Sequence, residues 1–198
     1  MNALVVGNGS IGKRHIQNLL SISNYNIIIS TKQRKPKSLN KKRCIFVKSL
    51  NEGLQYNPSI GFVTNVSSEH IQTSLLLAKA GCHIFIEKPL SNSLKETEKL
   101  LNMVKKEKLV TLMGCNLRFH SCIKKIKSLI EQKTIGEIIS VKSECGTYLP
   151  EWHPNENYSM SYAARDDLGG GVVLTCIHEI DYLYWFFGEI KEVFSITG

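Results

Sequence analysis

The feature that most constrains the fold of this chain is a glycine-rich turn near its N-terminus, which reads Gly-Asn-Gly-Ser-Ile-Gly over residues 7–12. A four-residue apolar run at 3–6 precedes it and suits one buried strand. Apolar residues at Ile16, Leu19 and Leu20 follow it at a helical spacing. The sequence therefore predicts a strand, a tight turn and a helix in succession.

Three glycines in this context have separate physical uses. Gly7 permits the tight turn, Gly9 lets the backbone approach a pyrophosphate, and Gly12 lets the helix pack close to the strand. The start of the helix then presents free N–H groups and a partial positive charge to phosphates. An ordinary glycine turn is the alternative, but the flanking strand and helix favour dinucleotide binding. The expected contacts are Gly7, Asn8, Gly9, Ser10, Ile11 and Gly12.

Strand and helix patterns continue to alternate along the first 118 residues. Apolar runs at 26–30, 44–47, 60–65, 83–86 and 109–113 are separated by helical or turn segments. This alternation predicts a doubly wound parallel sheet, whose ligands bind at the carboxyl ends of the strands. The candidates there are Thr64, Asn65, Glu87 and Lys88, together with His70, for which a structural role is the stronger alternative.

The end of the second predicted strand bears on cofactor choice. An NAD enzyme usually holds an Asp or Glu about 20 residues beyond the glycine turn, on the ribose 2′-hydroxyl. Here the chain reads Ser30-Thr31-Lys32-Gln33-Arg34, and its first acidic residue is Glu52. Hydroxyl and cationic groups suit a 2′-phosphate. We therefore expect Ser30, Thr31, Lys32 and Arg34 to favour NADP, with NAD possible; a lysine-rich loop is the alternative.

The charge of the chain is unevenly distributed, which raises nucleic acid as a possible partner. Residues 1–51 hold ten Lys and Arg and no Asp or Glu, whereas the rest hold 15 basic and 17 acidic side chains. A basic third of this kind can bind nucleic acid. The basic segment 31–43, however, has no aromatic residue for base stacking. We expect no nucleic-acid partner, and cofactor phosphate and solvent account for the charge.

Cysteine spacing and the lengths of the apolar runs limit the cellular compartments in which the chain is expected. None of the six cysteines forms a C-x-x-C pair, so the spacing suggests neither a metal nor a redox motif. No signal peptide is apparent, and the longest apolar stretch, 171–188, contains three ionisable residues. We expect a cytoplasmic chain with reduced thiols and no membrane partner.

Residues 119–198 are predicted to form part of a second, α+β domain. A helix around 123–130 precedes an alternating strand at 137–145, and a helix over 172–187 precedes the start of another strand at 190–197. These strands suit an antiparallel sheet with one face covered. The long segment between them is rich in aromatic residues, which suits a binding loop. Its expected substrate contacts are Tyr148, Trp152 and Arg165, because aromatic faces suit sugars and Arg suits anions.

Four motifs together resemble the glucose–fructose oxidoreductase / inositol dehydrogenase (Gfo/Idh/MocA) family. They are Gly7-x-Gly-x-x-Gly12, Glu87-Lys88-Pro89, Gly169-Gly170-Gly171 and His178-x-x-Asp181. The resemblance implies hydride transfer between a secondary alcohol of a sugar-like molecule and the nicotinamide. It assigns a hydrogen bond to the reacting hydroxyl to Lys88 and proton acceptance to His178. It also places Asn116 on the cofactor, and Arg118 and Asp181 beside the substrate.

The chain departs from this family pattern in two ways. Leu174 stands where the family often has an Asp four residues before the histidine, although Asp181 offers a carboxylate on the same helical face. Family members also run further and complete the antiparallel sheet. A half-built sheet leaves an open edge and an uncovered apolar face, so we expect poor stability unless a partner covers it, and a homo-oligomer if the sheet is completed. A non-catalytic dinucleotide-binding protein or remnant is the alternative function.

Overall fold

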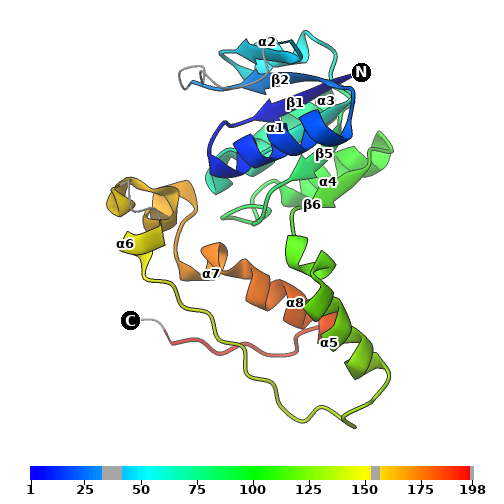
Figure 1. Ribbon diagram of the computed structural model, residues 1–198, viewed down its shortest axis with the longest axis vertical. Helices are drawn as coiled ribbons and strands as arrows, with labels where there is room; N and C mark the ends of the chain where they lie inside the picture. Colours follow the sequence, from blue (N-terminus) through cyan, green and yellow to red (C-terminus); the bar gives the residue numbers. More distant parts are fainter. Residues whose placement is uncertain (33–41, 153–156, 197–198) are drawn as a thin grey trace.

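The computed structural model describes residues 1–32, 42–152 and 157–196, and its centre is a six-stranded parallel sheet (Figure 1). The strand order is β3-β2-β1-β4-β5-β6, which is the order of a doubly wound dinucleotide-binding fold. The parallel α/β architecture predicted from the alternating pattern is confirmed. The strands are β1 (Asn2–Val6), β2 (Asn26–Ser30), β3 (Cys44–Val47), β4 (Ile60–Val63), β5 (His83–Ile86) and β6 (Thr111–Met113).

Side-chain alternation along β1 divides the hydrophobic core between the two faces of the sheet. Ala3 and Val5 point to the face covered by helix α1 (Ser10–Ile22), whereas Leu4 and Val6 point to the opposite face. That second face is covered by the helices α2 (Leu50–Leu54), α3 (His70–Lys79) and α4 (Thr97–Lys106). Because both faces are covered, the central strands are apolar throughout, which is why they appear as continuous apolar runs in the sequence.

The register of the sheet aligns the carboxyl ends of its central strands. Val6 is paired with Ser30 on one side and with Val63 on the other, and Val63 is paired with Ile86. The segments that follow these four residues therefore leave the sheet at one edge. This alignment brings the glycine turn, the segment after β2 and Glu87-Lys88 to a common site.

The chain beyond β6 is mostly helical. The 3₁₀ helix η2 (Asn116–Phe119) leads into α5 (Ser121–Glu131), and α8 (Ile177–Phe187) packs beside them (Figure 1). The remaining short elements are η1 (Ser67–Glu69), α6 (Leu149–Trp152), η3 (Tyr158–Met160), η4 (Tyr162–Ala164), η5 (Asp166–Leu168) and α7 (Val172–Thr175). The predicted boundary between domains at residue 118 falls within η2 and stays a prediction.

The two strands predicted for the second domain are not formed in the described residues. Residues 137–145 and 190–196 are without regular secondary structure and pair with no strand. Their apolar side chains face solvent, with Ile139 96% exposed and Phe194 88% exposed. Apolar alternation predicts a strand only where a neighbour satisfies the backbone N–H and C=O groups, and the described part of the chain supplies no such neighbour. The expected antiparallel sheet is therefore not shown.

Candidate functional site

The turn between β1 and α1 has a backbone that requires glycine at two positions. Gly7 adopts a φ of +103°, and its N–H donates to the carbonyl oxygen of Ser30 at 3.0 Å. A Cβ at Gly12 would lie 2.3 Å from the carbonyl oxygen of Gly7, so the helix meets the turn at a distance that only glycine permits. The hydroxyl of Thr64 lies 2.9 Å from the carbonyl oxygen of Val6 and 3.1 Å from that of Gly7, and so ties β4 to the turn.

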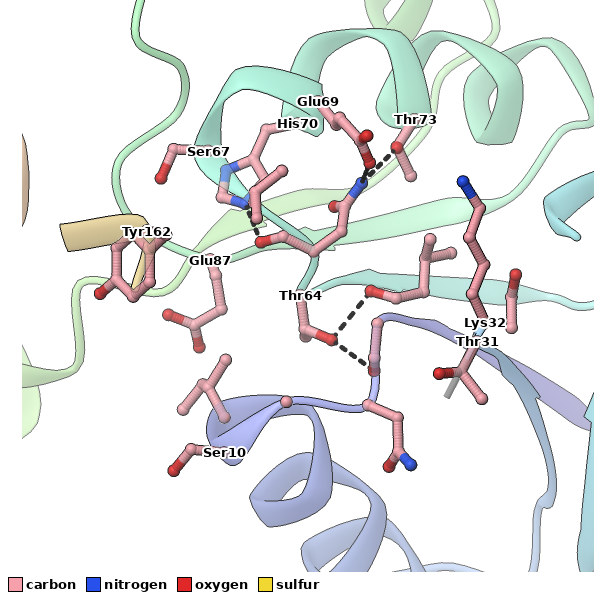
Figure 2. A pocket seen from close by; sticks show the side chains of 18 of the residues that line it. Ser10, Thr31, Lys32, Thr64, Ser67, Glu69, His70, Thr73, Glu87 and Tyr162 are labelled. Carbon is pink, nitrogen blue, oxygen red and sulfur yellow. Dashed lines mark hydrogen bonds between the residues drawn. The ribbon is translucent and has the colours of Figure 1, made fainter. Parts of the chain in front are cut away.

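A cleft of about 990 Å³ opens beside this turn, along the carboxyl edge of the sheet (Figure 2). Its volume lies at the upper end of the range that small-molecule and cofactor sites usually occupy. Most of the predicted cofactor residues line it: Gly7, Asn8, Gly9, Ser10, Ile11, Ser30, Thr31, Lys32, Thr64, Asn65, His70, Glu87 and Lys88. Gly12 lies behind the turn and Asn116 is exposed at the start of η2; neither lines the cleft. Arg34 lies outside the described residues.

Unpartnered polar atoms and an open backbone make this cleft suitable for a dinucleotide. The Oδ1 atoms of Asn8 and Asn65 are buried, and neither has a hydrogen-bond partner among the described residues. Buried polar atoms without partners are costly unless a ligand or water satisfies them. A Cβ built on Gly9 meets no atom within 4 Å, so the backbone there is accessible from the cleft. The N-terminus of α1 carries no side-chain cap, which leaves its N–H groups available to a phosphate.

One end of the cleft carries the basic side chain of Lys32, and the carboxylates of Glu69 and Glu87 also line the cleft (Figure 2). Thr31 and Lys32 lie at this end, away from Glu87 and Tyr162 (Figure 2). Arg14 and Lys48 also line the cleft, and the sequence reasoning did not select them. Arg14 lies on the first turns of α1, where a helical projection from the glycine turn would have pointed to it. Lys48 follows β3, and the parallel topology places that position at the same sheet edge.

The other end of the cleft is built around Glu87 and Lys88, which follow β5. The carboxylate of Glu87 contacts Nε2 of His15 at 2.7 Å, and the His15 ring packs against Phe62 and Phe85. The backbone N–H of Lys88 donates to the second carboxylate oxygen of Glu87 at 3.3 Å. Glu87 is thus held by α1 and in turn orients the start of Lys88, a link that spacing alone did not reveal.

Lys88 and His178 lie in one neighbourhood although 90 positions separate them in sequence. The Nζ of Lys88 donates to the carbonyl oxygen of Thr175 at 2.9 Å, at the end of α7. Burial lowers the pKa of His178, and the positive charge of Lys88 lowers it further. The Nδ1 of His178 is buried without a hydrogen-bond partner among the described residues. This arrangement holds an uncharged imidazole beside an ammonium group, which suits proton acceptance.

Arg118 and Asp181, both expected beside a substrate, form an ion pair with each other. The Nε and Nη2 of Arg118 donate to the two carboxylate oxygens of Asp181 at 2.9 and 2.6 Å. The guanidinium also lies over the ring of Trp185. Burial and the Asp181 carboxylate raise the pKa of the neighbouring Cys115 thiol to about 11. The pair joins η2 to α8, so Asp181 is engaged by Arg118 rather than by His178.

The remaining predicted contacts differ in their placement. Trp152 lines the cleft, whereas Tyr148 is exposed and Arg165 forms a bidentate ion pair with Asp167. His70 is 2% exposed, and its ring nitrogens lie 2.7 Å from the carbonyl oxygen of Pro89 and 3.1 Å from that of Asn65. This histidine therefore supports two of the loops that form the cleft, in agreement with the structural alternative weighed for it. Tyr162, which the sequence reasoning missed, lines the cleft near Glu87.

The strand order, the glycine turn and the cleft define a dinucleotide-binding Rossmann protein. Comparison with known families is more specific: residues 1–115 match the oxidoreductase family with an NAD-binding Rossmann fold, and residues 123–198 match the GFO/IDH/MocA C-terminal domain. The chain belongs to the Gfo/Idh/MocA oxidoreductase family. The resemblance drawn from its four motifs is confirmed.

Individual relatives agree with this assignment. An uncharacterized oxidoreductase of Bacillus subtilis is 32% identical over 197 residues, covering 96% of this chain and 55% of its own. A myo-inositol 2-dehydrogenase of Thermotoga maritima is 28% identical over 200 residues, covering 96% and 56%. The solved myo-inositol 2-dehydrogenase of Lactobacillus plantarum superposes with a TM-score of 0.78 at 18% identity, over 95% of this chain and 56% of that one, which supports the fold. The chain spans about half the length of the curated relatives it matches.

Among the helices formed by the described residues, none has both the length and the apolar character that crossing a membrane requires.

Proposed function

We propose that the chain is the cofactor-binding part of an oxidoreductase that transfers a hydride between NADP and a secondary alcohol of a sugar, nucleotide-sugar or cyclitol. The observation that carries this proposal is the cleft that runs from the glycine turn to Lys88. His178 does not line the cleft, but it lies close enough to Lys88 for the ammonium charge to lower its pKa. The inositol dehydrogenase among the relatives supports a cyclitol or sugar as the substrate class. NADP, when bound, supplies the hydride acceptor; the protein supplies binding, orientation and proton transfer.

The preference for NADP rests on the basic end of the cleft. Lys32 lies at that end (Figure 2), Arg14 and Lys48 add two further cations to the lining of the cleft, and Ser30 and Thr31 add hydroxyl groups. An NAD enzyme would hold a carboxylate on the ribose 2′-hydroxyl at this position. Cationic side chains bind a 2′-phosphate through charge-assisted hydrogen bonds. We therefore expect tighter binding of NADPH than of NADH, measured as two dissociation constants under one salt condition.

Lys88 and His178 divide the proposed proton chemistry between them. The ammonium group of Lys88 donates a hydrogen bond and stabilises negative charge that develops on the reacting oxygen. His178 takes the hydroxyl proton, because burial and the charge of Lys88 lower its pKa and keep the ring neutral near pH 7. Lys88 donates one of its three ammonium N–H groups to the carbonyl oxygen of Thr175, which fixes the direction of the side chain. Two N–H groups remain for other acceptors.

Substitution of Lys88 tests the catalytic half of the proposal. Lys88→Met is expected to lower kcat at least about 100-fold with cyclitols, sugars or nucleotide sugars, the usual scale for a positioned acid–base group. NADPH affinity should change little, because the phosphate contacts lie at the other end of the cleft. Lys95→Met, on the exposed segment before α4, is the matched control. Unchanged turnover in Lys88→Met would refute the assigned role.

A second candidate function is a dinucleotide-binding protein without turnover. One observation favours it: in the described part of the chain no carboxylate is hydrogen-bonded to Nδ1 of His178, Leu174 precedes this histidine by four residues, and Asp181 is bound by Arg118. NADPH binding without oxidation or reduction of any tested alcohol or ketone would support this candidate. Turnover that His178→Gln abolishes would exclude it.

A further inference from the structure

A cluster of two thiols and one carboxylate lies beside α8, outside the dinucleotide cleft. The Sγ atoms of Cys145 and Cys176 are 3.9 Å apart. A carboxylate oxygen of Glu179 completes a group whose three ligand atoms all lie within 4.8 Å of one another. Cys145 is exposed, whereas Cys176 and Glu179 are half-buried, so an ion from solution has access to the group.

Three separate structural features bring these residues together. Cys176 is the single residue between α7 and α8, and Glu179 follows it by three positions, which places both side chains on one side of the chain. Cys145 comes from the extended segment after α5. A hydrogen bond of 2.6 Å between the hydroxyl groups of Ser143 and Tyr182 holds that segment against α8.

The separation of the sulfurs matches two thiolates on one metal ion. A disulfide requires about 2.05 Å between its sulfurs. Two thiolates on a tetrahedral zinc ion, each at about 2.3 Å, lie about 3.8 Å apart. We propose that Cys145, Cys176 and Glu179 bind one Zn²⁺, with a fourth position open to water.

The chemistry of the cluster agrees with a cationic ligand. Zinc binds cysteine as the thiolate, so metal binding releases the thiol protons, and the Glu179 carboxylate supplies a further anionic donor. Thiolate sulfur with one carboxylate oxygen is a donor set that zinc accepts and that magnesium and calcium do not favour.

The position of the cluster gives the metal a structural consequence. Thr175, whose carbonyl oxygen accepts the hydrogen bond from Lys88, precedes Cys176 directly, and His178 follows it by two residues. A metal bound at Cys176 and Cys145 therefore ties the junction between α7 and α8 to the segment after α5. This site does not depend on the proposed hydride transfer and is tested without any substrate.

Direct metal binding by the full chain tests the proposal. The reduced protein, freed of metal by a chelator, is titrated with Co²⁺ followed by optical spectroscopy, and with Zn²⁺ followed by calorimetry. We expect one ion per chain and the absorption of tetrahedral, thiolate-bound cobalt. Removal of a group that only hydrogen-bonds to a metal ligand lowers metal affinity about 10- to 100-fold, so removal of a ligand itself should lower it at least as much. Cys145→Ser and Cys176→Ser should weaken binding by about 100-fold or more, and Glu179→Gln by about tenfold.

A control thiol and a variant-free measurement complete the test. Cys122→Ser removes an exposed thiol on α5 and should leave metal affinity unchanged. If the serine variants fail to fold, alkylation of the wild-type chain decides instead: Zn²⁺ should slow modification of Cys145 and Cys176 but not of Cys122. Equal alkylation with and without Zn²⁺ would overturn the proposal. A Cys145–Cys176 disulfide on exposure to peroxide, in a chain whose reduced form binds no metal, would also overturn it.

Discussion

Lys32 is the residue at which the cofactor preference is most directly tested. Its side chain is exposed at the basic end of the cleft, so its removal leaves the core intact. Lys32→Ala should weaken NADPH binding about tenfold, which corresponds to about 1.4 kcal/mol, because a charge-assisted contact to phosphate is lost. NADH lacks the 2′-phosphate and should bind the variant and the wild type nearly equally. Fluorescence titration of both reduced cofactors measures the two dissociation constants.

The control for Lys32 is a lysine of similar exposure outside the cleft. Lys13 lies on α1, close to the glycine turn, but its side chain does not line the cleft. Lys13→Ala should alter NADPH and NADH affinity by the same small factor, since it acts only through the long-range field. Equal weakening of NADPH binding by the two substitutions would argue against a 2′-phosphate contact at Lys32.

His70 makes the stability of the chain depend on pH. Burial lowers its pKa below the ordinary value of about 6.5, and this effect outweighs the hydrogen bonds to Pro89 and Asn65 and the charges of Glu87 and Glu69. The unfolded chain therefore binds more protons than the folded chain in the window just below pH 6.5. The free energy of unfolding should fall as the pH is lowered through that window.

Denaturant unfolding between pH 5 and pH 7.5 checks this linkage. His70→Gln should flatten the dependence of unfolding free energy on pH, because the titrating group is gone while a side-chain amide still reaches a carbonyl oxygen. His178, whose pKa is also lowered, keeps part of the slope. His83→Gln, at an exposed position on β5, serves as the control. Parallel pH profiles for wild type and His70→Gln would contradict the assignment.

In the unit formed by β1, the glycine turn and α1, two glycines are expected to serve different properties: Gly12 the stability of the fold and Gly9 the binding of the dinucleotide. Gly12→Ala places a methyl group 2.3 Å from the carbonyl oxygen of Gly7 and 2.9 Å from the hydroxyl of Thr64, so the helix or the turn must move. We expect a loss of about 2–4 kcal/mol in unfolding free energy, within the range for overpacking and backbone displacement. Thermal and denaturant unfolding measure this loss.

Gly9→Ala is the matched variant in the same turn. A Cβ there meets no atom of the protein within 4 Å, and the residue has an ordinary negative φ of −72°. Unfolding free energy should change by less than about 1 kcal/mol, as for most substitutions away from packed sites. Dinucleotide affinity should fall at least tenfold, because the methyl group occupies the space that a pyrophosphate would enter. A Gly9→Ala variant that loses stability but keeps its dinucleotide affinity would contradict the role assigned to Gly9.

The junction between α7 and α8 shows what helical spacing could not predict. The sequence predicts one helix over 172–187, with Leu174, His178 and Asp181 on one face. The chain instead leaves the helical conformation at Cys176, where no Gly or Pro marks the break. The interruption leaves the carbonyl oxygen of Thr175 free to accept a hydrogen bond from Lys88, which lies 87 residues earlier in the chain. Local patterns carry no information on such a contact, so the break becomes visible only in the assembled structure.

At the scale of the whole molecule, local pattern predicts the sheet and the helices beyond it, but not the fate of the two strands expected after residue 118. The strands β1, β2 and β4 are buried on both faces, so their continuous apolar runs specify strands. The segments at 137–145 and 190–196 alternate in the same way, but a strand also needs a partner for its backbone, and spacing does not name that partner. The glycine turn, Thr31, Lys32 and Lys88 were predictable for the same local reason. The Arg118–Asp181 pair and the His15–Glu87 contact depend on tertiary packing.

The distribution of buried side chains predicts unequal local stability across the chain. Among the described hydrophobic residues after Val104, only Ala163 is buried, whereas both faces of the sheet hold a continuous core. Opening free energies rise with buried apolar contact, from near zero at exposed segments to the global value in core strands. Hydrogen–deuterium exchange should therefore leave the amides of β1, β2 and β4 protected longest. The amides of α5 and α8 should exchange early.

The same exchange measurement, repeated over a range of protein concentrations, shows whether the exposed face of α8 stays open to solvent or is covered by a second copy of the chain. The aromatic face of α8, with Tyr184 and Phe187 exposed, would become protected if a second copy of the chain covered it. Protection that rises with concentration in α8 alone would show such association. Protection of α8 equal to that of β1 at every concentration would contradict the predicted division of stability, since the side chains of this helix bury too little surface to hold it closed on their own.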